Sequence, residues 1–67
     1  MTAIFNPMDL NYRIAVVHAT GKFPATTLML DAILAGHLTL SGDLIDDIKL
    51  CDQWLRNYNE RQQSFAV

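Results

Sequence analysis

Cysteine, glycine, proline and tryptophan are all scarce in this chain of 67 residues, which has one cysteine, three glycines, two prolines and one tryptophan. A single cysteine excludes an intrachain disulfide. The isolated glycines form no phosphate-binding loop. His18 and His37 stand far apart, without carboxylates at helical spacing, so they form no metal-site pattern. The sequence therefore predicts neither a cofactor nor a metal ion.

Charged residues are also few, at 18% of the chain against about 25% in typical soluble domains. The net charge is −2 and the basic residues are scattered, so the sequence disfavours binding to nucleic acid or to an anionic membrane. The longest apolar stretch, Leu28 to Leu40, is interrupted by polar residues and is too short to span a bilayer. Residues 1–7 lack the basic and apolar regions of a signal peptide. With a lone thiol, these features predict a cytoplasmic protein.

Hydrophobic residues, by contrast, make up 51% of the chain. A domain of this length buries only about 60% of the surface that its unfolded chain exposes, so its stability is expected to be small. Small domains of this kind usually need a disulfide, a metal or association with another chain, and the composition leaves the third route. We therefore expect a homodimer, or a protein target that covers the excess apolar surface.

Helix signals divide the chain into three segments. In the first, Asn6 is a preferred N-cap, Pro7 suits the first helical position and Gly21 suits the residue after the helix. Residues 10–16 also alternate as a strand would, but the chain offers no second strand-like segment to pair with. The first segment therefore predicts a helix near 7–20.

The second segment is apolar on more than one face, which is typical of a buried central helix. It begins at Pro24, which suits a first turn, and ends at Gly36. We predict a helix near 24–36. The connector that follows, residues 37–40, is short and apolar, so we expect it to pack against the domain.

The third segment carries the strongest helix signal. Ser41 is a preferred N-cap, acidic residues follow it, and Arg56 and Arg61 come towards the end, an order that complements the helix dipole. We predict a helix near 42–61 and a frayed tail at 62–67. The whole chain is thus predicted to be one compact all-α domain of three helices, and to be dimeric.

A heptad stripe runs along this third helix. Leu44, Ile48, Cys51, Leu55 and Tyr58 are spaced by four, three, four and three residues, which places them on one side of a helix. Trp54 and Leu50 widen the stripe into a broad apolar face, and Trp54 fits a core position as well as an interface position. The span of about two heptads is too short to indicate a coiled coil. The predicted interface, for a second copy or a target, consists of Leu44, Ile48, Leu50, Cys51, Trp54, Leu55 and Tyr58.

Reactive side chains on the third helix do not predict catalysis. Cys51 has Asp47 and Asp52 as neighbours, which would raise the pKa of its thiol, so we interpret it as a small buried hydrophobe. The acidic group of Asp43, Asp46, Asp47 and Asp52 lacks the spacing of a calcium-binding loop. We interpret these carboxylates as exposed capping charges in the first turns of the helix.

These features predict a small non-enzymatic protein that binds another protein through an apolar helical face. Its role would be that of a regulator, inhibitor or adaptor, and a phage or mobile-element origin fits such a protein. The alternative is a helix-turn-helix DNA-binding transcriptional regulator, with a turn at 36–41 and the third helix in the major groove. Its groove-facing residues would include Asp43 and Asp46, whose carboxylates repel phosphate. A structural subunit of a larger assembly is a third hypothesis.

Overall fold

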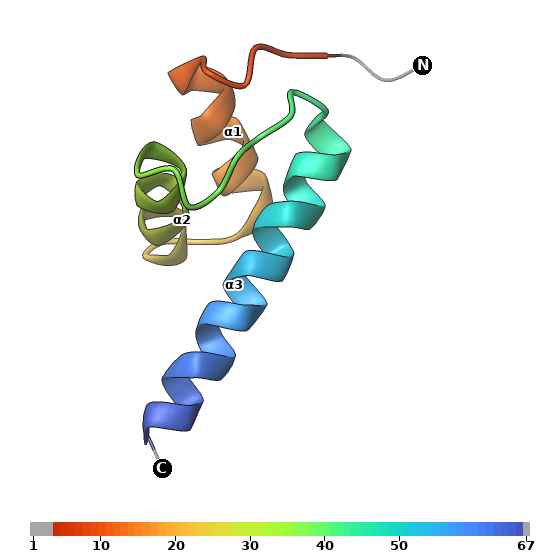
Figure 1. The fold of residues 1–67 in the computed structure, drawn as a ribbon. Helices are drawn as coiled ribbons and strands as arrows, with labels where there is room; N and C mark the ends of the chain where they lie inside the picture. Colours follow the sequence, from red (N-terminus) through yellow and green to blue (C-terminus); the bar gives the residue numbers. More distant parts are fainter. Residues whose placement is uncertain (1–3, 67) are drawn as a thin grey trace.

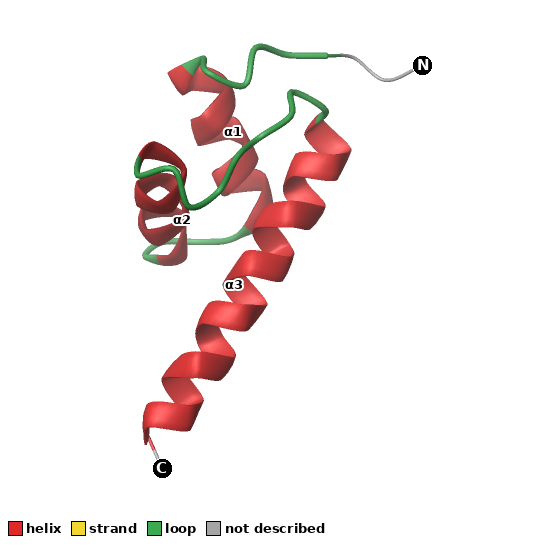
Figure 2. Ribbon diagram, in the orientation of Figure 1, coloured by secondary structure: helices red, strands yellow, loops and turns green. Residues whose placement is uncertain are grey.

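Three helices make up the fold, as the sequence predicted. A computed structural model describes the backbone of residues 4–66 and the side chains of residues 4–62. The helices are α1 (Leu10–Thr20), α2 (Ala25–Leu34) and α3 (Leu44–Ala66) (Figure 1). Within residues 4–66 there is no strand, only an isolated antiparallel bridge between Ile4 and Asp43 (Figure 2). The all-α fold class is therefore confirmed.

Helix α1 begins three residues later than predicted. The side chain of Asp9 caps it by accepting a hydrogen bond from the Asn11 backbone N–H at 3.1 Å. Asn6 instead accepts a hydrogen bond from the Met8 N–H, which holds residues 6–9 in a turn before the helix. The predicted cap at Asn6 is thus wrong, because its side chain closes a preceding turn. The predicted end is correct, with Gly21 donating to the Val17 carbonyl.

Helix α2 buries one face only, which corrects its prediction as a buried central helix. Met29, Ala32 and Ile33 are buried, whereas Leu28 and Leu34 are exposed on the other side. The helix ends at Leu34, and Gly36 follows in the left-handed region at φ 87°. Glycine is favoured there because it lacks a Cβ.

Helix α3 begins at Leu44 and continues through Ala66, past the predicted end at residue 61. Its cap is Asp43, whose carboxylate accepts from the N–H groups of Ile45 and Asp46 at 3.1 and 3.3 Å. Ser41, the predicted cap, is wrong because its hydroxyl donates to Asp47. The predicted tail is helical as far as Ala66, and Val67 lies outside the described residues.

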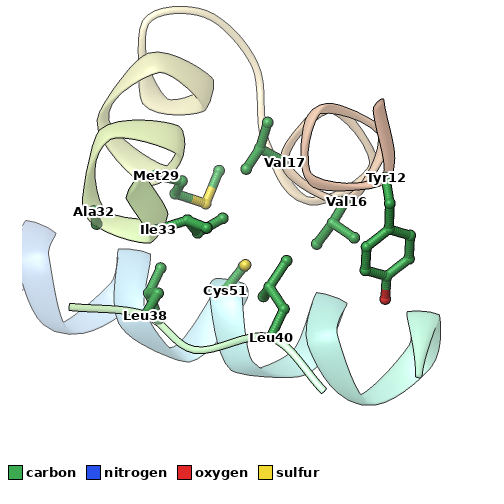
Figure 3. Close-up of a cluster of buried hydrophobic side chains, with 9 residues drawn as sticks. All are labelled: Tyr12, Val16, Val17, Met29, Ala32, Ile33, Leu38, Leu40 and Cys51. Carbon is green, nitrogen blue, oxygen red and sulfur yellow. The ribbon is translucent and has the colours of Figure 1, made fainter. Parts of the chain in front are cut away.

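The core lies where α1 and α2 meet the first half of α3 (Figure 3). Side chains from every element point towards one another there, and the connector after α2 contributes Leu38 and Leu40, as predicted. Leu44, Ile48, Trp54 and Leu55 of α3 are partly buried and pack against this cluster. The fully enclosed hydrophobic cluster consists of Tyr12, Val16, Val17, Met29, Ala32, Ile33, Leu38, Leu40 and Cys51.

Helix α3 is about twice as long as the other two helices, with 23 residues against 11 in α1 and 10 in α2. Leu55 lies beside the end of α1, because a Cβ placed on Gly21 would be 3.6 Å from its Cδ2. Residues 56–66, here called the α3 extension, project beyond the α1–α2 loop (Figure 1). The molecule is accordingly elongated, at 44 × 21 × 20 Å.

Candidate protein-interaction site

The acidic group predicted on α3 contains one buried member. Asp47 is only 2% exposed, which corrects its interpretation as an exposed capping charge. It accepts hydrogen bonds from the Ser41 N–H at 2.8 Å, the Ser41 hydroxyl at 3.0 Å, the Gly42 N–H at 3.0 Å and the Tyr12 hydroxyl. Burial alone would raise the pKa of Asp47, but these hydrogen bonds outweigh it and lower the pKa. We call this group, Tyr12, Ser41, Gly42 and Asp47, the Asp47 cluster.

The Asp47 cluster holds the N-terminal segment as well as α3. The ring of Phe5 stacks on that of Tyr12, with centroids 5.1 Å apart, and the Phe5 N–H donates to the Gly42 carbonyl at 2.7 Å. Gly42 has φ 98°, and a Cβ there would clash with the Phe5 carbonyl oxygen. Burial, followed by the hydrogen bond to Asp47, raises the pKa of Tyr12 well above its usual range. No buried polar side-chain atom of residues 4–62 lacks a hydrogen-bond partner, so Asp47 and Tyr12 stabilise the fold.

Cys51 is fully buried in the core, as the sequence indicated. Burial, with a smaller contribution from the Asp47 charge, raises the pKa of its thiol to about 11. The thiol is therefore protonated at neutral pH, and a protonated thiol is a poor nucleophile. A partner would reach Cys51 only if the bundle opened.

The described residues hold no group of three or more His, Cys, Asp and Glu side chains placed to bind a metal ion. Among the same residues, no helix has both the length and the apolar character needed to cross a bilayer.

The structure divides the predicted interface into two parts. Leu44, Ile48, Cys51 and Leu55 face α1 and α2 and belong to the chain's own packing. Of the remaining three, Leu50 is 41% exposed, whereas Trp54 and Tyr58 are partly buried, as are Leu44, Ile48 and Leu55. Trp54 belongs to both parts, because one portion of its side chain packs against the core and the rest is accessible.

The accessible part is organised around two stacked rings. The centroids of Trp54 and Tyr58 are 5.4 Å apart, and their planes differ by 19°. Together with Asn57 and Arg61 they line a shallow pocket of about 90 Å³. We call Leu50, Trp54, Asn57, Tyr58 and Arg61 the α3 side face. Sequence reasoning missed Asn57 and Arg61, although their spacing of three and seven residues from Trp54 places them on the same side of the helix.

Other apolar side chains are exposed away from α3. A wider hollow of about 320 Å³ lies between the start of α1, the end of α2 and the connector, and includes Met8, Leu34 and Leu38 in its lining. In the α1–α2 loop, Phe23 is 82% exposed. The excess of apolar residues predicted from composition thus reaches the surface at several places.

Comparison of the chain with protein-family models, with curated proteins and with solved structures gave no match.

Proposed function

We propose that this protein is a non-enzymatic protein-interaction module that acts as a regulator, inhibitor or adaptor in the cytoplasm. The α3 side face would be its binding surface. The observation that carries the proposal is the stacked pair of Trp54 and Tyr58 beside Arg61 around one pocket. Trp, Tyr and Arg are the residue types most enriched among the side chains that dominate binding energy at protein interfaces.

The geometry of the side face suits binding. Stacking restrains the rings of Trp54 and Tyr58, so less side-chain freedom is lost when a partner arrives. The pocket is of a size that accepts one small side chain. The α3 extension stands clear of α1 and α2, so a helix of a partner can lie along it (Figure 1). Binding there would act by covering a functional surface of the target.

The reactive groups of the chain support the same proposal. Asp47 and Tyr12 are bonded to each other, and Cys51 is a buried free thiol, so each has a structural use. A reduced cysteine suits the proposed cytoplasmic location. That the protein is not an enzyme is part of the proposal.

No observation favours the alternative of a helix-turn-helix regulator. Residues 35–43 separate α2 from α3, which is longer than the roughly three- to four-residue turn of that motif. The first turn of α3 carries exposed Asp46 beside its cap Asp43. An acidic helix N-terminus would be repelled by the DNA backbone.

The proposal is tested by comparing three baits in affinity capture from the native cell. Wild-type protein and Leu34→Ala should retain the same proteins, because Leu34 is exposed on α2 and is not part of the side face. The double variant Tyr58→Ala, Arg61→Ala should lose them while keeping its far-UV circular dichroism spectrum, because neither side chain belongs to the core cluster. If the double variant keeps its fold and its full set of captured proteins, the side face is not the binding surface.

A further inference from the structure

We propose that the wider hollow, between the start of α1, the end of α2 and the connector, binds a small apolar carboxylic acid. The carboxylate would pair with Arg13, and the hydrocarbon part would lie against the walls. We call this site, with its volume of about 320 Å³, the Arg13 hollow. It shares no lining residue with the pocket of the α3 side face, so the inference does not rest on the proposed function.

The walls of the Arg13 hollow are apolar apart from one charge. Ile33, Leu38 and Leu40 belong to the buried core and form part of the lining. Met8 and Leu34 also line the hollow and are largely exposed to water. Among the described residues of the lining, Arg13 is the one titratable side chain. An apolar molecule with a single negative charge matches such a site.

The turn before α1 holds the guanidinium of Arg13 in place. The Arg13 Nε donates to the Pro7 carbonyl oxygen at 2.8 Å, and one Nη lies 3.2 Å from the Met8 sulfur. Asn6 fixes this turn, because its side chain accepts from the Met8 N–H. The guanidinium is therefore restrained before any ligand arrives, which lowers the entropy lost on binding.

Arg13 keeps donors for an anion. A guanidinium has five N–H groups, and the contacts with Pro7 and Met8 use two of them. The ion pair found among residues 4–62 joins Asp52 to Arg56, so no carboxylate of this part of the chain pairs with Arg13. A carboxylate suits the planar guanidinium because it can accept two parallel hydrogen bonds. One positive charge in the lining also favours a monoanion over a phosphate.

The volume sets the size of the acid. The hollow of about 320 Å³ lies at the lower end of the range of roughly 300–1,000 Å³ that small-molecule sites occupy. At about 30 Å³ for each molecule of liquid water, this is the space of about ten waters, or of a ligand with about ten non-hydrogen atoms. Octanoate is a molecule of this size.

The lining suits a free acid better than a segment of a protein. A peptide carries an N–H and a C=O group at each residue, and burying these groups without partners costs free energy. Besides Arg13, the polar side chains of the described lining are limited to that of Thr39. A hydrocarbon chain needs no such partners, and it removes the apolar surfaces of Met8 and Leu34 from water.

Titration of ¹⁵N-labelled protein with octanoate, followed by NMR of the backbone amides, tests the inference. The signals that move should saturate and should belong to residues around the hollow, such as Met8, Gly36 and Thr39. Octanol has the same hydrocarbon chain without the charge. It should bind at least about tenfold more weakly, because the charged hydrogen bonds to Arg13 are missing.

Three variants locate the acid. Arg13→Gln should weaken octanoate binding by about tenfold or more. Lys22→Gln, the matched control, removes an exposed charge from the α1–α2 loop and should leave binding unchanged. Leu34→Glu keeps the guanidinium but adds a carboxylate beside the hollow, so it should also weaken binding. Because Leu34 is exposed, this variant tests the site even if Arg13→Gln does not fold.

Three outcomes would overturn the inference: no saturable binding below the concentration at which octanoate aggregates, equal binding of octanoate and octanol, or unchanged binding by a folded Arg13→Gln. Signals that move only at residues 50–61 would also contradict it, because they would place the acid on the α3 side face. If a short peptide ending in leucine binds the hollow more tightly than octanoate does, the occupant is a protein C-terminus and the proposal of a free acid is wrong.

Discussion

The substitution Asp47→Asn tests whether the Asp47 cluster stabilises the fold. The four donors divide evenly between the two carboxylate oxygens, with Ser41 on one and with Gly42 and Tyr12 on the other. An asparagine side-chain oxygen can keep both Ser41 bonds. Its amide nitrogen then faces Gly42 and Tyr12, and the Tyr12 hydroxyl can turn to accept from it. The Gly42 N–H is left without an acceptor.

An unsatisfied buried donor costs about 1–3 kcal/mol, and the remaining bonds lose the strengthening that a charged acceptor gives. We therefore expect Asp47→Asn to lower the free energy of unfolding by about 2–4 kcal/mol. A chain of this length has only about 3–10 kcal/mol in total. Urea unfolding at pH 7, followed by circular dichroism, should show a large fall in the midpoint with an unchanged slope.

Asp46→Asn is the matched control, since Asp46 is the exposed neighbour of Asp47 and lies outside the cluster. The pH dependence gives a second criterion. Because the folded-state pKa of Asp47 is lowered, its stabilisation is present above the unfolded pKa of about 3.9 and is lost as the pH falls through the folded value. The difference between wild type and Asp47→Asn should therefore shrink in acid. If Asp47→Asn were as stable as wild type at pH 7, or if the difference in their free energies of unfolding persisted in acid, this reasoning would be refuted.

Three further predictions follow from the same contacts. Gly42→Ala should destabilise the protein in urea unfolding more than Gly36→Ala does, because both positions have positive φ but only Gly42 faces a backbone oxygen. In the folded protein at pH 8, Cys51 should react with a thiol reagent far more slowly than it does in the denatured protein, because the folded chain buries it and raises its pKa to about 11. Equal rates in the two states would contradict its burial. Leu55→Asp should abolish the fold by circular dichroism, because Leu55 packs against the core, whereas Arg56→Asp should leave it intact.

The number and order of the helices could be predicted because their signals are local. Gly21 directly follows α1, and Gly36 lies two residues beyond the end of α2. The starts were harder, since Ser41 and Asp43 are both good caps two residues apart. Asp43 is the cap because the Ser41 hydroxyl donates its hydrogen bond to Asp47 instead. Asp47 also accepts a hydrogen bond from Tyr12, which lies 35 residues earlier. A contact between such distant residues leaves no local trace in the sequence.

The candidate site could also be predicted only in part from the sequence. The heptad spacing placed Leu44, Ile48 and Leu55 together on one side of α3, and that side, predicted as an interface, packs against the chain's own core. Where that packing stops depends on the lengths of α1 and α2 relative to α3, which the spacing does not contain. Consequently the separation of Tyr58 from the core residues, and the pocket it forms with Arg61, emerged only from the structure.

The order in which the core is assembled follows from its composition. Val16, Val17, Met29 and Ile33 belong to α1 and α2, yet they are covered on one side by α3, which supplies Cys51 at the centre of the cluster. Until the ribosome has released the chain as far as Leu55, the apolar sides of α1 and α2 are therefore open to water. Helices of this length do not persist alone. We therefore expect the core to close only after the first half of α3 has been synthesised.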